Sequence, residues 1–319
     1  MKTFFKNAIL LATVRMFCSC ATTYYTNPVI NTALPDPTVI RLKETYYAAG
    51  TTNDRKPVFP IFTSKDLVNW TPAGHVFQDF PDWTVGSFWA PEFYQIDGKT
   101  YCYYTARRKA DNISCIGVAI ADSPTSKFVD HGMLLDWGKE AIDSYIFDDQ
   151  GQLYIIWKAY GLNPERPIEL LAQKLSADGL HVEGEVFSLL QDIENIGMEG
   201  QCIFKEGDYY YLLYSARDCC SERSDYEVRV ARSKSFRGPY EKYTGNPILK
   251  GDGKYIQSCG HGTMVRSKTN RMYYLCHAFL VGKHHEGRKP ILQEMVVGKD
   301  QWIHFLTGNI TQKNQRFPR

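Results

Sequence analysis

Apolar residues along this chain are grouped in short runs rather than spaced at helical intervals. Runs such as ETYYAAG, KTYCYYTAR and GDYYYLLYSAR are rich in tyrosine and begin or end near Gly, Asp or Lys. Aromatic residues in runs of this length, with turn residues at their ends, are typical of β-strands. Almost no segment has the i, i+3, i+4 period of an amphipathic helix, so the pattern predicts an all-β protein.

The same order of elements recurs five times. Each repeat has an acidic or His-led motif, a strand, a turn with Asp, Gly or Asn, an aromatic strand and a third apolar strand. The leading residues follow one another at intervals of 51 to 62 positions: Asp36, Glu92, Asp143, Glu199 and His261. A short edge strand after the third would complete a four-stranded antiparallel sheet, so we predict a five-bladed β-propeller around a central channel. A β-sandwich would have shorter, less regular spacing, and an α/β fold would have helices between its strands.

Three of the leading residues are carboxylic acids in unusual contexts: Asp36 in LPDPT, Asp143 in AIDSY and Glu199 in GMEGQ. Because the first strand of each propeller blade lines the channel, we expect these acids to meet at one mouth. Carboxylates that share a pocket repel one another, which raises the pKa of at least one of them. A protonated and an ionised carboxyl together can act as the acid and base of glycoside hydrolysis. The prolines beside Asp36 restrict its backbone, so we expect a turn that fixes this carboxylate.

Composition does not change the predicted fold, but it distinguishes the N-terminal residues from the rest of the chain. The 319 residues carry a net charge of +2 with scattered Lys and Arg, which does not favour binding to nucleic acid or to an acidic membrane. Lys2 and Lys6 precede the apolar run AILLATV, and FCSC follows where a secretory leader would be cleaved. We interpret residues 1–20 as an export signal, with a disordered extension as the alternative, and residues 21–319 as a single propeller domain.

A cysteine at the end of this leader suggests a further refinement. Cys20 follows the small residue Ser19, so a lipid anchor could be attached after cleavage. We expect an exported bacterial protein that is periplasmic or anchored at the cell surface. The sequence does not indicate its oligomeric state.

Seven further cysteines lie beyond Cys20. Cys102 and Cys115 could face each other across a hairpin as a disulfide, but buried thiols are the favoured interpretation. The adjacent pair Cys219 and Cys220 follows the second strand of the fourth repeat, near the expected mouth, and we assign it no function. The spacing of Cys and His residues does not match a zinc site.

The motifs LPDPTVI, FWAPEF, AIDSYIFDDQGQLYIIW, GMEGQ and GHGTMV resemble those of glycoside hydrolase family 43, from about Asn27 to about Gln301. The resemblance implies a five-bladed propeller that cleaves plant polysaccharide side chains or xylo- and arabino-oligosaccharides with inversion. It implies that Asp36 is the general base and Glu199 the general acid, with a water molecule between them. Asp143 matches the acid that orients the proton donor and tunes its pKa.

The resemblance also suggests binding residues. His261 matches a histidine that, in many relatives, helps to hold a calcium ion in the channel, usually through water; no cofactor is otherwise required. Arg288 resembles a last-blade arginine that reaches the substrate, although it could instead pair with a surface acid. Trp89 could stack on a sugar or pack the blade, and Phe88 and Tyr145 are further candidates for substrate contact. Glu92 is interpreted as structural, since the resemblance assigns it no proton transfer.

Alternative functions are less well supported. Retaining fructan-cleaving relatives would open with an Asn-Asp-Pro-Asn-Gly type motif, and mannoside phosphorolysis would need a basic phosphate cluster. A non-catalytic carbohydrate-binding surface lipoprotein would have no need of a proton donor, whereas all three acids are present here.

The sequence is least informative about the substrate. The sequence ends soon after the fifth repeat, so we expect no additional β-sandwich of the kind found in many β-xylosidase relatives. The segments FQDFPDWTVGSF and YGLNPERP are long enough to wall a pocket, which favours exo action. We therefore expect an exo-acting α-L-arabinofuranosidase on arabinose- or xylose-containing chains, with a β-D-xylosidase or an endo-arabinanase as the alternative.

Overall fold

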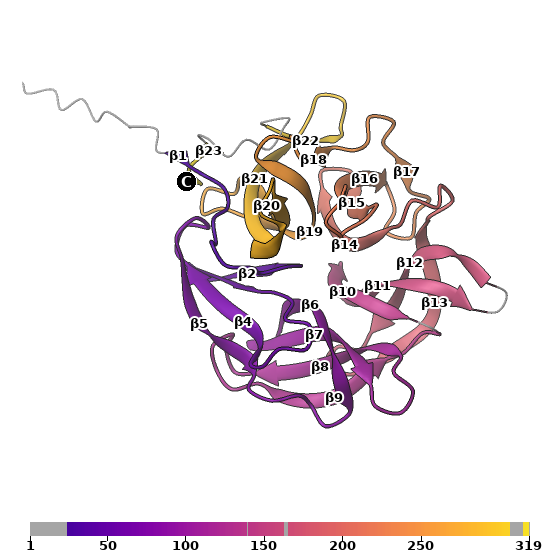
Figure 1. Ribbon diagram of the computed structural model, residues 1–319. Helices are drawn as coiled ribbons and strands as arrows, with labels where there is room; N and C mark the ends of the chain where they lie inside the picture. Colours follow the sequence, from indigo (N-terminus) through magenta and orange to yellow (C-terminus); the bar gives the residue numbers. More distant parts are fainter. Residues whose placement is uncertain (1–23, 139, 163–164, 307–314, 319) are drawn as a thin grey trace, which may run out of the picture.

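The computed structural model describes residues 24–138, 140–162, 165–306 and 315–318, and it forms a five-bladed β-propeller (Figure 1). The predicted export signal and the lipid attachment site lie outside the described residues. Within them, the only helical element is a short 3-10 turn, η1 (His284–Glu286). No helix in these ranges is long and apolar enough to cross a membrane. The all-β prediction and the number of blades are confirmed.

The blades follow one another in sequence order around the ring, and in each the strands are antiparallel neighbours in chain order. Blade 1 contains β2 (Thr38–Leu42), β3 (Thr45–Ala49), β4 (Val58–Ser64) and β5 (Trp70–Phe77). Blade 2 contains β6 (Thr84–Ile96), β7 (Lys99–Arg108), β8 (Ser114–Ala121) and β9 (Val129–Leu135). Blade 3 contains β10 (Ala141–Asp149), β11 (Gln152–Leu162), β12 (Glu165–Leu175) and β13 (Val182–Gln191).

The last two blades differ slightly at their outer edges. Blade 4 contains β14 (Glu199–Glu206), β15 (Tyr209–Ala216) and β16 (Glu227–Ser233), and two short strands, β17 (Glu241–Lys242) and β18 (Leu249–Lys250), both pair with β16. Blade 5 contains β19 (Ile256–Arg266), β20 (Met272–Leu280), β21 (Lys289–Val297) and β22 (Ile303–Phe305).

The second strands of blades 4 and 5 are the most deeply buried strands of those blades, because a propeller blade is covered on both faces by its neighbours. All nine residues of β20 are buried, and β15 is buried from its second residue onward. This explains why these strands appear in the sequence as continuous aromatic runs rather than alternating ones. The cores lie between blades: Phe59 of blade 1, for example, packs on Phe88 and Tyr104 of blade 2 with ring centroids 5.9 and 5.8 Å away.

The ring is closed by the two ends of the described chain. Strand β1 (Tyr24–Tyr25) pairs with β23 (Gln315–Arg316). The buried Asn27 side chain then bonds both backbone groups of Leu292 in blade 5, donating to its carbonyl at 3.0 Å and accepting from its N–H at 2.9 Å. The segment leading into blade 1 is thereby fixed against blade 5.

In each blade a residue in the first strand, or just before it in blade 1, has a positive φ, and these five residues form a ring at one mouth of the channel. The values are 51°, 43°, 57°, 58° and 41° for Asp36, Ala90, Asp143, Gly200 and His261. In blades 2 to 5 the strand register also shifts at this point, and such bulges re-aim the side chains beside them. The repeat in the structure is therefore offset from the predicted one. The residues equivalent to Asp36 in blades 2 and 4 are Ala90 and Gly200, not Glu92 and Glu199.

Candidate active site

A pocket with a volume of about 500 Å³ occupies this mouth, and all five blades contribute to its walls. Asp36, Asp143 and Glu199 lie together in its lining, as the repeat pattern predicted. Trp89, His261 and Arg288 line it too. A cavity of this size accommodates a sugar unit with part of a second one.

The backbone around this ring is held by residues on the second strand of the preceding blade or, in the case of Thr51, two residues beyond its end. In four blades the ring N–H donates to a side chain there: Ala90 to Thr51 at 2.8 Å, Asp143 to Thr105 at 3.1 Å, His261 to Ser215 at 2.7 Å and Asp36 to His277 at 3.0 Å. The corresponding side chain behind Gly200 is Lys158, which cannot accept a hydrogen bond. Gly200 N–H donates instead to Asp143 Oδ2 at 3.0 Å. The position tolerates only glycine without rearrangement, since a Cβ there would lie 2.7 Å from His261 Cγ.

Asp36 is a buried carboxylate surrounded by donors. Its Oδ2 accepts a hydrogen bond from Thr51 at 2.6 Å, and its Oδ1 lies 3.0 Å from Arg288 Nη1 and 3.4 Å from His261 Nδ1. Burial alone would raise the pKa of Asp36, but Arg288, His261 and His277 outweigh it and hold the pKa well below its usual range. Asp36 is therefore ionised at neutral pH, as a general base must be.

Asp143 has the opposite balance. Its Oδ2 accepts the Gly200 N–H, and His261 Nδ1 lies 3.8 Å away. Burial raises the pKa of Asp143 to about 6. The negative charges of Glu199 and Asp36 also raise this pKa, whereas His261 lowers it. One carboxyl pKa is therefore raised, as expected, but burial contributes more to the shift than repulsion by the neighbouring carboxylates does.

Glu199 is held between a cation and a phenol. Lys158 Nζ lies 3.0 Å from Glu199 Oε2 and 3.6 Å from Glu140 Oε2, and Tyr226 donates its hydroxyl to Glu199 Oε1 at 3.1 Å. Burial would raise the pKa of Glu199, but Lys158 outweighs it and keeps the pKa below its ordinary value. The pair of Asp143 and Glu199 therefore holds its proton on Asp143 when no sugar is bound.

The predicted sugar-binding residues divide into two groups. Trp89 and Arg288 line the pocket, and the indole N–H of Trp89 is anchored by Asn53 Oδ1 at 2.9 Å. Phe88 has no exposed surface because it packs against Phe59 and Phe80, so its prediction as a substrate contact is wrong for this conformation.

Tyr145 also lies outside the pocket lining. It packs between blade cores, with its hydroxyl 3.6 Å from Cys202 Sγ. It therefore supports the first strand of blade 3 rather than contacting a sugar.

Glu92 is placed where a structural role is expected. It is buried, lies outside the pocket lining and accepts a hydrogen bond from Thr38 at 2.8 Å. Burial raises the pKa of Glu92 to about 8, so this carboxyl is neutral at neutral pH. It joins the first strands of blades 1 and 2 as a hydrogen-bonded acid.

The predicted calcium ion finds no ready set of ligands. Within the described ranges, no group of three or more His, Cys, Asp or Glu side chains is arranged to hold a metal ion. His261 Nδ1 is directed instead at Asp36 and Asp143. Calcium bound through water at His261 remains a prediction.

The first of the two segments expected to wall the pocket does not do so, since none of residues 77–88 lines it. The second segment, residues 160–167, joins β11 to β12, and the prediction for it falls partly on residues 163–164, which lie outside the described ranges. The walls come instead from residues near Asn53, from the Cys219–Cys220 segment and from the turn that carries Arg288.

Sequence reasoning missed three residues that contact the acids: Lys158, His277 and Tyr226. A usable signal existed for the first two. The heptapeptides TYYAAGT, KTYCYYT, QLYIIWK, YYYLLYS and RMYYLCH all have tyrosine at the third position, and their seventh residues are Thr51, Thr105, Lys158, Ser215 and His277. When these heptapeptides are aligned, Lys158 is the one residue among the five seventh positions that carries a permanent positive charge. Tyr226 has no such repeat signal.

Three carboxyl groups converge at the channel mouth of this five-bladed propeller, and one is ionised while another has a raised pKa. Such a set can supply the general acid and the general base of a glycoside hydrolase. The comparisons with known proteins specify the family. Residues 25–303 match the model for glycosyl hydrolases family 43, and the chain belongs to that family. Its members are inverting hydrolases of O-glycosyl bonds, as the sequence motifs implied.

Relatives with different named activities match this chain. An extracellular exo-α-(1→5)-L-arabinofuranosidase, ArbA, from Cellvibrio japonicus is 31% identical over 69% of this chain and 70% of its own length. A β-xylosidase from Bacillus subtilis is 27% identical over 89% of this chain, which spans 57% of that protein. Among solved structures, a thermostable family-43 glycoside hydrolase superposes with a TM-score of 0.79 at 26% identity, over 92% of this chain and 99% of its own.

Proposed function

We propose that this protein is an exo-acting α-L-arabinofuranosidase that removes terminal units from plant cell-wall polysaccharides or oligosaccharides. The observation that carries the proposal is the pocket of about 500 Å³ with Asp36, Asp143 and Glu199 at its base. A pocket of this volume suits one terminal sugar better than the interior of a chain. The likeness to ArbA of Cellvibrio japonicus, whose name specifies exo action on α-(1→5)-linked arabinofuranose, supports the choice of sugar.

In this mechanism Asp36 is the general base. Its pKa, held well below the usual range with Arg288 and His261 beside it, keeps it ionised and ready to accept a proton from water. The water attacks the anomeric carbon from the Asp36 side while the glycosidic oxygen leaves on the opposite side, which inverts the configuration. Thr51 and Arg288 fix the orientation of the carboxylate during the attack.

Glu199 is the general acid and Asp143 is its proton partner. With no sugar bound, Lys158 favours ionised Glu199, and the proton of the pair is held on Asp143. When the substrate binds, the proton passes from Asp143 to Glu199, and Lys158 then pairs with Glu140, whose Oε2 already lies 3.6 Å from its Nζ. Glu199 then donates this proton to the departing glycosidic oxygen. Asp143 is ionised at that stage. It accepts the hydrogen bond from the Gly200 N–H and so fixes the backbone next to Glu199.

A β-D-xylosidase is the second candidate, because the Bacillus subtilis β-xylosidase aligns with 89% of this chain. The three acids would have the same roles with either sugar. Export is part of the proposal: ArbA is named extracellular, and the N-terminal residues have the composition of a leader.

The test is a panel of substrates. The purified protein is assayed on 4-nitrophenyl α-L-arabinofuranoside, β-D-xyloside and β-D-galactoside, and on linear arabinan with analysis of product length. We expect the highest kcat/KM on the arabinofuranoside and release of arabinose alone from arabinan. Preference for the xyloside would favour the second candidate, and internal cleavage of arabinan would contradict exo action.

A further inference from the structure

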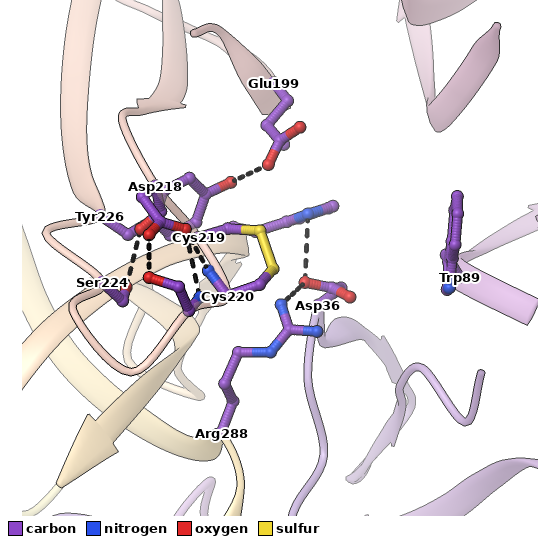
Figure 2. The surroundings of a disulfide bond; sticks show 12 residues. Asp36, Trp89, Glu199, Asp218, Cys219, Cys220, Ser224, Tyr226 and Arg288 are labelled. Atoms are coloured by element: carbon purple, nitrogen blue, oxygen red, sulfur yellow. Dashed lines mark hydrogen bonds and ion pairs between the residues drawn. A yellow bond between two sulfur atoms is a disulfide. The ribbon is translucent and has the colours of Figure 1, made fainter. Parts of the chain in front are cut away.

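The pocket wall contains a disulfide between two residues that are adjacent in the sequence. Cys219 and Cys220 are bonded, and both line the pocket (Figure 2). The five other cysteines in the described ranges are free, buried thiols, which matches the favoured interpretation of Cys102 and Cys115. Cys220 is exposed and Cys219 half-buried, so this disulfide faces the pocket rather than a core.

The segment that carries the disulfide is tightly fixed. The Asp218 carboxylate accepts the N–H groups of Cys220 at 2.9 Å and Ser221 at 3.2 Å, and Ser224 donates its hydroxyl to the Asp218 carbonyl at 2.7 Å (Figure 2). Ser224 Oγ is also 2.7 Å from Ser258 Oγ in blade 5. The two sulfur atoms are therefore held in place at the pocket wall.

This segment lies on the side of the general acid. It links β15 to β16 in blade 4, the blade that also carries Glu199 on β14. Ser215, just before the segment, pairs with Glu199 across the sheet, and Tyr226, at its end, donates its hydroxyl to Glu199. A general acid protonates the leaving oxygen, so groups on its side of the pocket face the leaving group.

The surface presented there is apolar and polarisable. Phe279 and His284 stack with their ring centroids 4.1 Å apart, both line the pocket, and His284 Nε2 is 3.3 Å from the Cys220 carbonyl. A disulfide has no N–H or O–H donor, and sulfur makes favourable dispersion contacts. Trp89 lies across the pocket, on the other side of Asp36 from the disulfide (Figure 2).

We propose that the Cys219–Cys220 disulfide, with Phe279 and His284, is the platform on which the leaving-group sugar rests. The ligand class is a pentose residue, or an aryl aglycone, attached through the bond to be cleaved, with its C–H face against the sulfur atoms. This inference rests on the proposed function, since it takes Glu199 as the proton donor. It assigns to the disulfide a role in substrate selection and none in proton transfer.

The first part of the test establishes the bond in the purified protein. Alkylation without reductant, followed by mass spectrometry, leaves the peptide with Cys219 and Cys220 unlabelled if they are bonded. A phosphine reductant then supplies two electrons, cleaves the S–S bond to two thiols and makes both residues available for labelling. Labelling of both residues without reductant would overturn the proposal.

The second part separates the leaving-group platform from the rest of the site. The substrates are α-L-arabinofuranosyl fluoride, whose leaving group is one atom, and α-1,5-arabinobiose, whose leaving group is a sugar; xylosyl fluoride and xylobiose replace them if the panel favours xylosides. The proteins are the wild type with and without phosphine, the double variant C219A/C220A, and Glu222→Gln. Glu222 is exposed on the same segment and does not line the pocket, so its variant is the matched control.

We expect reduction and C219A/C220A each to lower the ratio of kcat/KM for the disaccharide to that for the fluoride by about three- to tenfold, through KM. Glu222→Gln leaves the ratio unchanged. An unchanged ratio in reduced wild type would overturn the platform, and this result stands even if the double variant does not fold. Failure of the oxidised wild type to hydrolyse either substrate would instead overturn the proposed function.

Discussion

Blades 1 and 2 each bury a carboxyl group near the channel, and the two groups have opposite pKa shifts. Asp36 contacts Arg288 and the histidines of blade 5, and its pKa lies well below the usual range. Glu92 accepts hydrogen bonds from the Thr38 hydroxyl and the Ile146 backbone, and burial raises its pKa to about 8. Because burial penalises charge at both positions, the cation beside Asp36 decides which carboxyl can act as a base.

The comparison also explains why the position of an acid in the repeat is a poor guide to its role. Glu92 lies two residues beyond the ring residue Ala90, whereas Asp36 is itself a ring residue and Glu199 precedes one, Gly200. A shift of one residue on a strand turns a side chain to the opposite face, and the bulge between Trp89 and Glu92 changes the register further.

The largest expected effect tests the difference between the two carboxyls directly. We predict that Asp36→Asn lowers kcat/KM by roughly 10²- to 10⁴-fold, the usual contribution of a general base, whereas Glu92→Gln stays within about threefold of wild type. Steady-state kinetics on the preferred aryl glycoside measures both, with circular dichroism as the control for folding. Equal losses in the two variants would remove the distinction between them.

The next prediction removes the cation that distinguishes Asp36. Arg288→Met takes away the charge that holds the Asp36 pKa down, so the pKa rises and the acidic limb of the pH profile of kcat/KM moves to higher pH. Loss of a buried charged hydrogen bond also lowers kcat/KM by roughly ten- to a hundredfold at the pH optimum. A lower kcat/KM with an unmoved acidic limb would mean that Arg288 only binds substrate.

A smaller effect is expected at Lys158, on the acid side of the pocket. The raised pKa of Asp143, about 6, indicates that the pair of Asp143 and Glu199 loses its proton above about pH 6, so kcat/KM falls on the alkaline side. Lys158 favours the ionised form of Glu199, so Lys158→Met moves the alkaline limb to higher pH. The conservative Lys158→Arg keeps the charge and leaves the limb in place. A limb that moves to lower pH in Lys158→Met would contradict this assignment.

The smallest effect concerns stability rather than rate. The pKa of Glu92 is raised in the folded state from its ordinary 4.5 to about 8, so the folded protein loses stability relative to the unfolded chain as pH rises through this interval. Glu92→Gln lacks this titration, so its free energy of unfolding relative to wild type increases between pH 4.5 and about 8 and then levels off. Urea unfolding at several pH values measures this. A difference independent of pH would show that Glu92 is not buried as a neutral acid.

Much of the fold could be predicted from local patterns, because each blade repeats the same strands and turns. The three acids could be found because Asp36, Asp143 and Glu199 begin first strands in distinctive contexts. The prediction for Phe88 is wrong because Phe88 is next to the pocket residue Trp89 and successive strand residues face opposite ways. Lys158 lies on a second strand, where an aromatic run conceals its equivalence to Thr105.

The remaining features depend on contacts that no local pattern encodes. Tyr226 reaches Glu199 across the sheet at the end of an irregular segment. The Cys219–Cys220 disulfide is placed in the pocket wall by a segment that is fixed to blade 5 through the contact of Ser224 with Ser258.

The most direct test of the central claim, that Glu199 is the proton donor opposite Asp36, is the dependence of Glu199→Gln on the leaving group. The variant and the wild type are compared on aryl glycosides whose phenols range from 2,4-dinitrophenol to unsubstituted phenol. A good leaving group departs without protonation, whereas a poor one requires it. We predict a small loss of kcat/KM with dinitrophenol and a loss of roughly 10²-fold or more with phenol. An equal loss for all phenols, or unchanged hydrolysis of the phenyl glycoside, would contradict the assignment.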